Sequence, residues 1–248
     1  MKKLALALVA ALPLAFASCG DDDASDLTLD QSSVTLDYNA ETTLKASEKN
    51  CTWTSSNPFV ATVDNDGVVK AAHVGTAVIS ATKDGNTVKC NVTVNATNNN
   101  FTLPEMNWGA KIDAIRPLYT AFDELKDGNY YMFATKNASG LPMYTYEFDT
   151  TTGGLVLSQL TVAAAEEEDF FYFIEQRYQY YDTNADNDDV YLNANTMSEA
   201  TLYIKYGTDR DGDAYAIFMP IDETRADASS YEAKAKAALQ ATYSVKKH

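Results

Sequence analysis

The sequence CTWTSSNPFVATVDNDGVVKAAHVGTAVISATKDGNTVKCNVTVN occupies residues 51–95. Short runs rich in Val, Thr and Ile alternate there with polar residues at a period of two, as half-buried strands do. The tripeptides Asn65-Asp66-Gly67 and Asp84-Gly85-Asn86 interrupt these runs and predict hairpin turns, because Asn and Gly tolerate positive φ. Similar short runs extend back to Leu27, so about seven strands are expected within residues 27–95. This spacing predicts an all-β sandwich.

The order of these segments resembles the bacterial Ig-like domain, group 2. The resemblance covers residues 27–95 and is carried by Trp53-Thr54-Ser55-Ser56-Asn57-Pro58, Val60-Ala61-Thr62-Val63, Asp66-Gly67-Val68-Val69 and Gly75-Thr76-Ala77-Val78-Ile79. It implies an Ig-like domain whose core is filled by Trp53. It also implies a spacer or adhesive module without catalytic chemistry.

Residues 1–18 have the parts of an export signal. Two lysines precede an apolar run over 4–16, which is too short to cross a bilayer, and Ala17-Ser18-Cys19-Gly20 follows. A cysteine directly behind small residues resembles the lipobox of bacterial lipoproteins. The resemblance implies cleavage before Cys19 and attachment to the membrane through lipid on that cysteine, since two or more acyl chains anchor stably. An ordinary signal peptide with an accidental cysteine is the alternative.

An acidic tether follows over residues 19–26. Gly20-Asp21-Asp22-Asp23 resembles the surface-export signal of lipoproteins in one group of Gram-negative bacteria. It implies a protein that is lipid-anchored in the outer membrane and exposed at the cell surface. A solvated tether on a protein that faces the periplasm is the alternative.

The other two cysteines, Cys51 and Cys90, form an even pair in an oxidising compartment. Cys51 shares a strand face with Trp53, and Cys90 shares one with Val92, so both are expected inside the sandwich. A disulfide between them would close a loop of about 40 residues and contribute roughly 3–4 kcal/mol. Two reduced core cysteines are the alternative.

The chain is strongly acidic, with 35 Asp and Glu residues, 19 Lys and Arg residues and a net charge of -16. The acidic residues are spread over both halves, and there is no basic stripe that could neutralise phosphates. We therefore expect no nucleic-acid partner.

A polar linker over 96–103 leads to a second domain, 104–248, which holds 15 of the 16 tyrosines. This domain contains an internal repeat at low sequence identity. Tyr131 stands 60 residues before Tyr191, and Tyr144 stands 59 before Tyr203. Expected strands near 129–136, 142–149 and 154–162 recur near 189–194, 200–207 and 213–221.

Helices are expected to precede both sets of strands. One runs over about 110–125, with a stripe that includes Ile115, Tyr119 and Leu125, and the other over about 165–181, with a stripe that includes Phe170, Ile174, Tyr178 and Tyr181. A closing helix runs from about Ser229 to Tyr243. We predict an α+β domain built from a duplicated helix-β-β-β unit, with an antiparallel sheet and helices on one face.

Catalytic constellations are absent from the sequence. Its two histidines, His73 and His248, provide no nucleophilic triad, and no phosphate-binding loop occurs. Residues 182–189 begin like a calcium loop, but Asn187 takes the place of the turn glycine, which favours a solvated connection. We predict no catalytic residue, metal or cofactor and no enzymatic activity; a glycan-active enzyme that uses paired carboxylates is the alternative.

The tyrosines provide the remaining functional signal. Tyr130, Tyr144, Tyr146 and Tyr180 belong to segments that place aromatic rings on both faces of their elements. Rings outside the core either contact a glycan or protein ligand or are covered by the helices or the other domain.

Two functions remain open. One is a surface-displayed lipoprotein whose Ig-like spacer presents an aromatic-rich domain to a glycan or protein. The other is a structural or envelope-assembly lipoprotein that docks to a partner in its own envelope.

Overall fold

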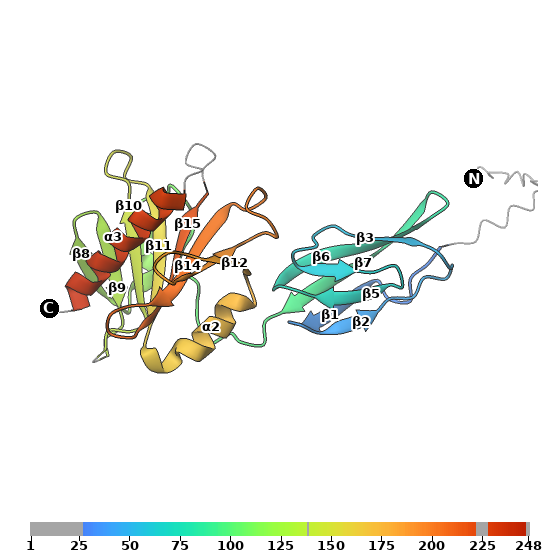
Figure 1. Ribbon diagram of the computed structural model, residues 1–248, viewed down its shortest axis with the longest axis horizontal. Coiled ribbons are helices and arrows are strands. Elements are labelled where there is room, and N and C mark those ends of the chain that lie inside the picture. The colour runs from blue at the N-terminus through green and yellow to red at the C-terminus, as the bar shows by residue number, and fades with distance from the viewer. Residues whose placement is uncertain (1–26, 138, 222–227, 247–248) are drawn as a thin grey trace, which may run out of the picture.

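The computed structural model describes residues 27–137, 139–221 and 228–246. The predicted leader, Cys19 and the acidic tether lie outside these residues. Two domains follow one another along the long axis of the molecule (Figure 1).

The first domain is a β-sandwich of two sheets. A four-stranded sheet has the order β1-β7-β6-β3, and a three-stranded sheet has the order β2-β5-β4. β1 pairs in parallel with β7, and the other pairs are antiparallel. The strands are β1 (Ser33–Asp37), β2 (Glu41–Thr43), β3 (Thr52–Ser55), β4 (Ala61–Val63), β5 (Val68–Ala71), β6 (Gly75–Lys83) and β7 (Asn86–Asn95).

The core of this sandwich includes Leu44, Val69 and Ile79, all of which are buried. Trp53, which the family resemblance placed in the core, packs against the same cluster but is only partly buried. Gly67 has φ +79°, and a Cβ at this position would lie 2.5 Å from the Leu44 carbonyl oxygen and 2.9 Å from the Trp53 ring. Only glycine fits this turn, because both the backbone angle and the space exclude a side chain.

Cys51 and Cys90 are buried free thiols, so the predicted disulfide is wrong. Cys90 lies on β7 opposite Ile79, and Cys51 immediately precedes β3, where Thr52 is opposite Thr82. β6 therefore separates the two cysteines within one sheet. Two strand spacings amount to about 9–10 Å, beyond the roughly 7 Å that a disulfide allows between Cα atoms.

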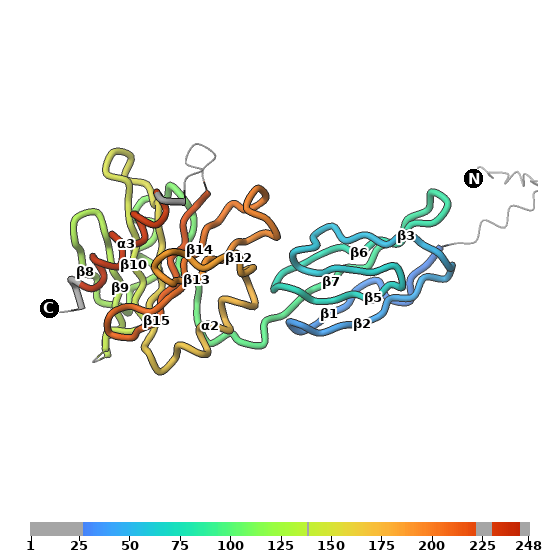
Figure 2. The backbone as a smooth tube through the Cα atoms, in the orientation of Figure 1, coloured from blue at the N-terminus to red at the C-terminus, as the bar shows by residue number. Residues whose placement is uncertain are grey.

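The polar linker is bound to the second domain. Gln176 Oε1 accepts hydrogen bonds from the backbone nitrogens of Thr97 (2.8 Å) and Asn98 (3.2 Å). The Gln176 carbonyl accepts one from Val74 N of the first domain, at 2.8 Å. Figure 2 follows the chain from β7 past α2, so this linker joins the domains at a defined contact.

The second domain is organised around one antiparallel sheet of eight strands. Its order is β12-β13-β14-β15-β11-β10-β9-β8. The strands are β8 (Asp123–Asp127), β9 (Tyr130–Ala134), β10 (Met143–Phe148), β11 (Leu155–Val162), β12 (Gln179–Thr183), β13 (Asp189–Leu192), β14 (Leu202–Thr208) and β15 (Ala214–Pro220).

Helices cover both faces of this sheet. The short helices α1 (Ile112–Ile115) and η1 (Arg116–Tyr119) lie on one face with α2 (Glu167–Glu175), which the exposed turn η2 (Ala164–Glu166) precedes. α3 (Ala228–Lys246) packs on the other face, against Leu157, Tyr203 and Tyr215. The prediction of helices on one face is therefore wrong for α3. We call the two sides the α2 face and the α3 face.

Each repeat has four strands rather than the predicted three. The strands that the sequence did not indicate are β8 and β12, the two sheet edges, and both were assigned to helix ends. Leu125 lies on β8 and Tyr181 on β12, and each is exposed, whereas Tyr178 is buried beyond the end of α2. An edge strand that buries little surface does not need alternating apolar residues, so the sequence pattern does not reveal it. Only its pairing with a neighbouring strand shows that it is a strand.

The repeat is visible in the sheet order, because the last strands of the two halves, β11 and β15, pair at the centre. The predicted equivalence of Tyr144 and Tyr203 is wrong by one residue. On β10, Tyr144 lies opposite Leu160 of β11. Pro220, which stands 60 residues after Leu160 and is its equivalent in the second repeat, lies opposite Leu202 of β14. Leu202 is thus the equivalent of Tyr144. A slip of one residue exchanges the faces of a strand, and Tyr203 accordingly faces α3.

Candidate binding groove

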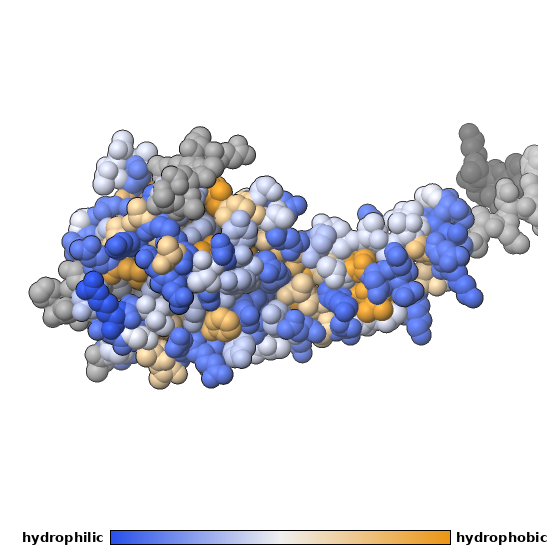
Figure 3. Space-filling view, viewed as in Figure 1, coloured by the Kyte–Doolittle hydropathy of each residue, from blue (hydrophilic) through white to orange (hydrophobic). Residues whose placement is uncertain are grey.

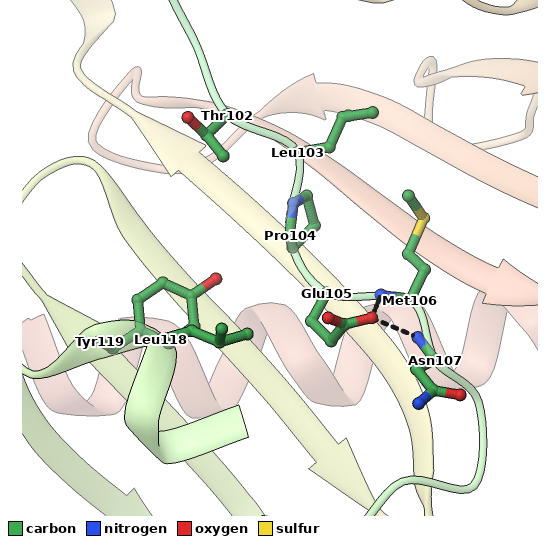
Figure 4. Close-up of a pocket in the computed structure, with 8 residues that line it drawn as sticks. All are labelled: Thr102, Leu103, Pro104, Glu105, Met106, Asn107, Leu118 and Tyr119. Atoms are coloured by element: carbon green, nitrogen blue, oxygen red, sulfur yellow. Dashed lines mark hydrogen bonds between the residues drawn. The ribbon is translucent and has the colours of Figure 1, made fainter. Parts of the chain in front are cut away.

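A groove of about 590 Å³ lies on the α2 face, where the extended segment 102–107 runs across the sheet beside η1. Figure 4 shows this segment with Leu118 and Tyr119 on the opposite side of the groove. The lining residues are Thr102, Leu103, Pro104, Glu105, Met106, Asn107, Leu118 and Tyr119.

Side-chain hydroxyls anchor the segment 102–107 to the sheet. Glu105 N donates to the Tyr146 hydroxyl at 2.9 Å, and Ser158 Oγ donates to the Glu105 carbonyl at 2.5 Å. The Tyr144 hydroxyl donates to the Thr102 carbonyl at 3.3 Å. Because β10 and β11 carry these side chains, the wall of the groove is tied to the centre of the sheet.

The Glu105 carboxylate organises the far end of the segment. Its Oε1 accepts hydrogen bonds from Met106 N at 2.9 Å and from Asn107 N at 2.7 Å (Figure 4). This local pairing turns the chain and keeps a negatively charged group at the groove.

Tyr119 forms the opposite wall and is held by aromatic neighbours. Its ring stacks on Phe133 at 4.7 Å, and its hydroxyl lies 2.5 Å from that of Tyr146. Burial raises the pKa of Tyr119 to about 12, although the hydrogen bond with Tyr146 opposes the shift. Burial and the neighbouring Tyr119 also raise the pKa of Tyr146. Both hydroxyls stay protonated at neutral pH, so they suit hydrogen bonding rather than proton transfer.

Leu118 lies next to this wall and is 57% exposed. The exposed Leu118 side chain beside the partly buried Tyr119 gives the groove both an apolar contact and a polar one. This combination is typical of sites that bind small molecules or sugar rings.

The four tyrosines selected from the sequence do not meet in one site. Tyr144 and Tyr146 are buried beneath the groove and support its wall. Tyr130 is partly buried beside the residues of the α3 face. Tyr180 on β12 is 47% exposed, and its hydroxyl lies 2.8 Å from Thr183 Oγ1.

Tyr130 has a partly buried acidic neighbour, Glu147. Burial raises the pKa of Glu147, and burial together with Glu147 raises the pKa of Tyr130. The pair lies away from the groove and belongs to the packing of the α3 face.

The sequence did not identify the residues that line the groove. Tyr119 was expected in the buried stripe of a long helix, and most of the segment 102–107 was assigned to the linker or the domain start. The apolar side chains of Phe101, Leu103, Met106 and Trp108 pack against the core of the second domain. The close spacing of these four apolar residues within an otherwise polar stretch was the sequence signal that the segment 102–107 packs against the domain.

The acidic run that resembled a calcium loop is occupied by protein contacts. Asp188 Oδ2 lies 2.9 Å from Lys205 Nζ, and Asp188 Oδ1 accepts a hydrogen bond from the Tyr215 hydroxyl at 2.7 Å. Within 27–137, 139–221 and 228–246, no group of three or more His, Cys, Asp or Glu residues could hold a metal ion. In the same ranges no helix is both long and apolar enough to cross a bilayer.

The family model of the bacterial Ig-like domain (group 2) matches residues 30–94. These residues form a bacterial Ig-like domain of group 2. The prediction for the first domain is thereby confirmed, and the groove lies outside the matched residues. A search of the curated proteins gives no match.

Three solved structures show weak similarity. A mutant of intimin from EHEC O157:H7 is 13% identical, with 77% of this chain and 98% of that chain covered and a TM-score of 0.26. Domains 5–6 of the S-layer protein SbsC are 17% identical, with 79% and 83% covered and a TM-score of 0.24. Human protocadherin-24 EC1-2 is 16% identical, with 79% and 94% covered and a TM-score of 0.25. Similarity at this level supports neither a shared function nor a shared ligand.

Proposed function

We propose that this protein is a lipid-anchored lipoprotein of the outer membrane, displayed at the cell surface, in which the Ig-like domain presents the second domain to a glycan or protein ligand. The ligand-binding part of this proposal rests on the groove between the segment 102–107 and η1. The anchor and the surface display rest on Cys19 and the acidic residues behind it. Its volume of about 590 Å³ lies within the usual range for ligand sites, about 300–1,000 Å³.

The lining of the groove favours a glycan. Leu118 and the neighbouring Tyr119 offer apolar contact to the carbon face of a sugar ring. Glu105, Asn107 and the Tyr119 hydroxyl offer acceptors and donors to its hydroxyl groups. The buried tyrosines beneath, Tyr144 and Tyr146, act by positioning the wall rather than by contact.

The joint between the domains supports a role for the Ig-like domain as a spacer. Gln176 is 4% exposed and binds both the linker and Val74 of the Ig-like domain. Arg177 adds a hydrogen bond from its guanidinium to the Asn98 carbonyl at 3.2 Å. A bound linker holds the second domain at a set orientation, which reduces the entropy lost when a ligand binds.

Envelope assembly through strand addition has less support. The edge strand β8 carries the charged residues Asp123, Glu124, Lys126 and Asp127 and is exposed throughout. The other edge, β12, has a register shift at Tyr181. Charges and bulges both oppose pairing with another strand. On the side shown in Figure 3, apolar side chains form small separate groups among hydrophilic ones.

The test uses the chain from residue 20 onward, which omits the predicted leader and the lipidated cysteine. It is screened on a glycan array and on immobilised extracellular host proteins, and hits are quantified by calorimetry. Leu118→Ala should weaken binding by about fivefold, because about 1 kcal/mol of apolar contact is lost. Tyr119→Phe should weaken a ligand that bonds to the hydroxyl.

Leu125→Ala is the matched control. Leu125 is an exposed leucine of the same domain, 38% exposed on β8 and outside the groove. Equal effects of the two leucine variants, or the absence of any ligand in both screens, would reject the groove as the binding site.

A further inference from the structure

A second pocket lies on the α3 face, between α3 and the hairpin that joins β14 to β15. Its volume is about 490 Å³. Arg210 comes from the hairpin, and Lys236, Leu239, Gln240 and Tyr243 come from α3. The groove described above is on the opposite face of the sheet, so the two sites are independent.

The charge of this pocket is unusual for so acidic a chain. Among the described residues, neither Arg210 nor Lys236 forms an ion pair with a carboxylate. In a chain with a net charge of -16, two cations without an acidic partner at one pocket indicate an attraction for an anion.

Asp209 is the one carboxylate among the described residues that line the pocket, and it is engaged in the hairpin. Asp209 Oδ1 accepts hydrogen bonds from Asp211 N at 2.9 Å and from Asp213 N at 3.1 Å. Two backbone donors thus stabilise its charge within the turn. Asp209 is therefore less able to compete for the guanidinium of Arg210.

The aromatic ring of the pocket orients the arginine. The guanidinium carbon of Arg210 lies 5.4 Å from the centroid of the Tyr243 ring. A guanidinium beside a ring keeps its edge N–H groups available, and their planar arrangement matches the two oxygens of a carboxylate. Lys236 supplies a second positive charge.

The remaining lining suits a sugar ring. Leu239 offers apolar contact, and the Gln240 amide has both a donor and an acceptor for hydroxyl groups. The volume lies within the usual range for small-ligand sites.

The wall of the pocket is held in place by contacts along α3. Tyr231 stacks on Tyr203 at 5.1 Å, and Ala235 and Ala238 are fully buried against the sheet. Glu232 Oε2 lies 2.9 Å from Lys205 Nζ. The helix therefore presents Lys236 and Tyr243 at fixed positions toward the hairpin.

We propose that the pocket between α3 and the β14–β15 hairpin binds a glycan residue that carries a carboxylate, with Arg210 as the carboxylate ligand. The site is additional to the groove and does not depend on it.

The proposal is tested with the chain from residue 20 onward, titrated with glucuronic acid, glucose and glucose 6-sulfate and followed by NMR. Glucuronic acid should bind, and glucose should bind at least tenfold more weakly. Addition of 0.5 M NaCl should weaken the glucuronic acid complex, because salt screens the attraction between the carboxylate and the two cations. Arg210→Gln and Lys236→Gln should each reduce the affinity for glucuronic acid by tenfold or more. Arg210→Lys should fall between the wild type and Arg210→Gln, since it keeps the charge without the planar fork.

Lys126→Gln is the matched control, because it removes one exposed cation that also lies over a tyrosine ring, Tyr131, at 4.8 Å. It should leave the affinity unchanged, and thermal unfolding should show that all variants are folded. Equal affinities for glucuronic acid and glucose, equal binding of glucose 6-sulfate, or equal losses in Arg210→Gln and Lys126→Gln would each overturn the proposal.

Discussion

Replacement of Lys205 by Met should destabilise the second domain by about 3 kcal/mol at pH 7. Lys205 lies on β14, and its side chain is 2% exposed. Its ammonium group is 2.9 Å from carboxylate oxygens of both Asp188 and Glu232. A third carboxylate, that of the exposed Asp186, is 3.8 Å away. Methionine fills much of the same space but leaves all three carboxylates without this cation.

The size of this loss in stability depends on the hydrogen bonds that the carboxylates keep in the variant. Removal of one partner from a buried ion pair usually costs about 3–5 kcal/mol. Here Glu232 keeps a hydrogen bond from the Tyr203 hydroxyl at 2.7 Å, and Asp188 keeps one from the Tyr215 hydroxyl at 2.7 Å. These donors partly compensate the remaining charges, so we expect the lower end of the range.

The loss should depend on pH. Burial opposes ionisation of Glu232, but hydrogen bonds from Tyr203, Lys205 and Asn184 outweigh it and hold the pKa of Glu232 below its usual value. A lowered folded-state pKa gives stability that is present above the unfolded pKa, about 4.3, and is lost as pH falls through the folded pKa. Because the variant lacks part of this stability, the difference between wild type and Lys205→Met should shrink below about pH 4.

The contribution of Lys205 to stability has the opposite pH dependence from that of Glu232. Burial opposes its charge, but Asp188 and Glu232 outweigh burial and raise the pKa of Lys205. The resulting stability is present below the unfolded pKa, about 10.4, and is lost as pH rises through the folded pKa. The effect of the substitution is therefore largest between about pH 5 and pH 10.

Urea unfolding measures this difference. Trp108 packs against the core of the second domain, so its fluorescence in a Trp53→Phe background reports that domain separately from the Ig-like domain. Lys126→Met is the control, because Lys126 lies on the exposed edge strand. A loss below about 1 kcal/mol at pH 7, a loss equal to that of the control, or one that is the same at pH 7 and pH 3.5 would refute the reasoning.

Three further predictions concern the joint, the thiols and the anchor. Gln176→Ala removes the acceptor of the hydrogen bonds from Thr97 N and Asn98 N, so it should weaken the binding of the linker to the second domain by about 1–2 kcal/mol and broaden the distribution of shapes in small-angle scattering. An unchanged distribution would contradict a role of this side chain in the joint. Cys51 and Cys90 should both react with iodoacetamide when the protein is unfolded without reductant, and mass spectrometry should show both alkylated. If neither is alkylated and the mass is two hydrogens below that of the reduced protein, a disulfide joins them instead. Cys19→Ala should move the protein from the membrane fraction to the soluble fraction of expressing cells, and retention in the membrane would exclude lipid on this cysteine as the anchor.

The first domain was predictable because its signals are local. Period-two alternation and the Gly67 turn depend on residues that are close in sequence, and they predicted the sandwich before any pairing was known. The cysteines show the limit of such signals. Cys51 and Cys90 were placed correctly as buried, but their separation by β6 depends on strand order, which alternation does not specify.

The second domain was predictable to the extent that its strands are buried. The central strands β10, β11, β14 and β15 have strong apolar and aromatic runs and were expected close to their observed bounds. The edge strands were missed because they bury little, and the equivalence of Tyr144 and Tyr203 failed because a slip of one residue leaves the composition of a strand unchanged.

The sequence by itself determined the Ig-like sandwich, the repeat and the central strands of the second domain, since each depends on periodic burial within a few residues. Only the tertiary structure decided which residues line the groove and the second pocket. Tyr119 and the segment 102–107 face each other on the same side of the sheet, and Arg210 lies beside Tyr243, which follows it by 33 residues in the chain. Such sites arise from packing between distant segments, and the same packing buried Tyr144 and Tyr146, which composition alone had suggested for ligand contact.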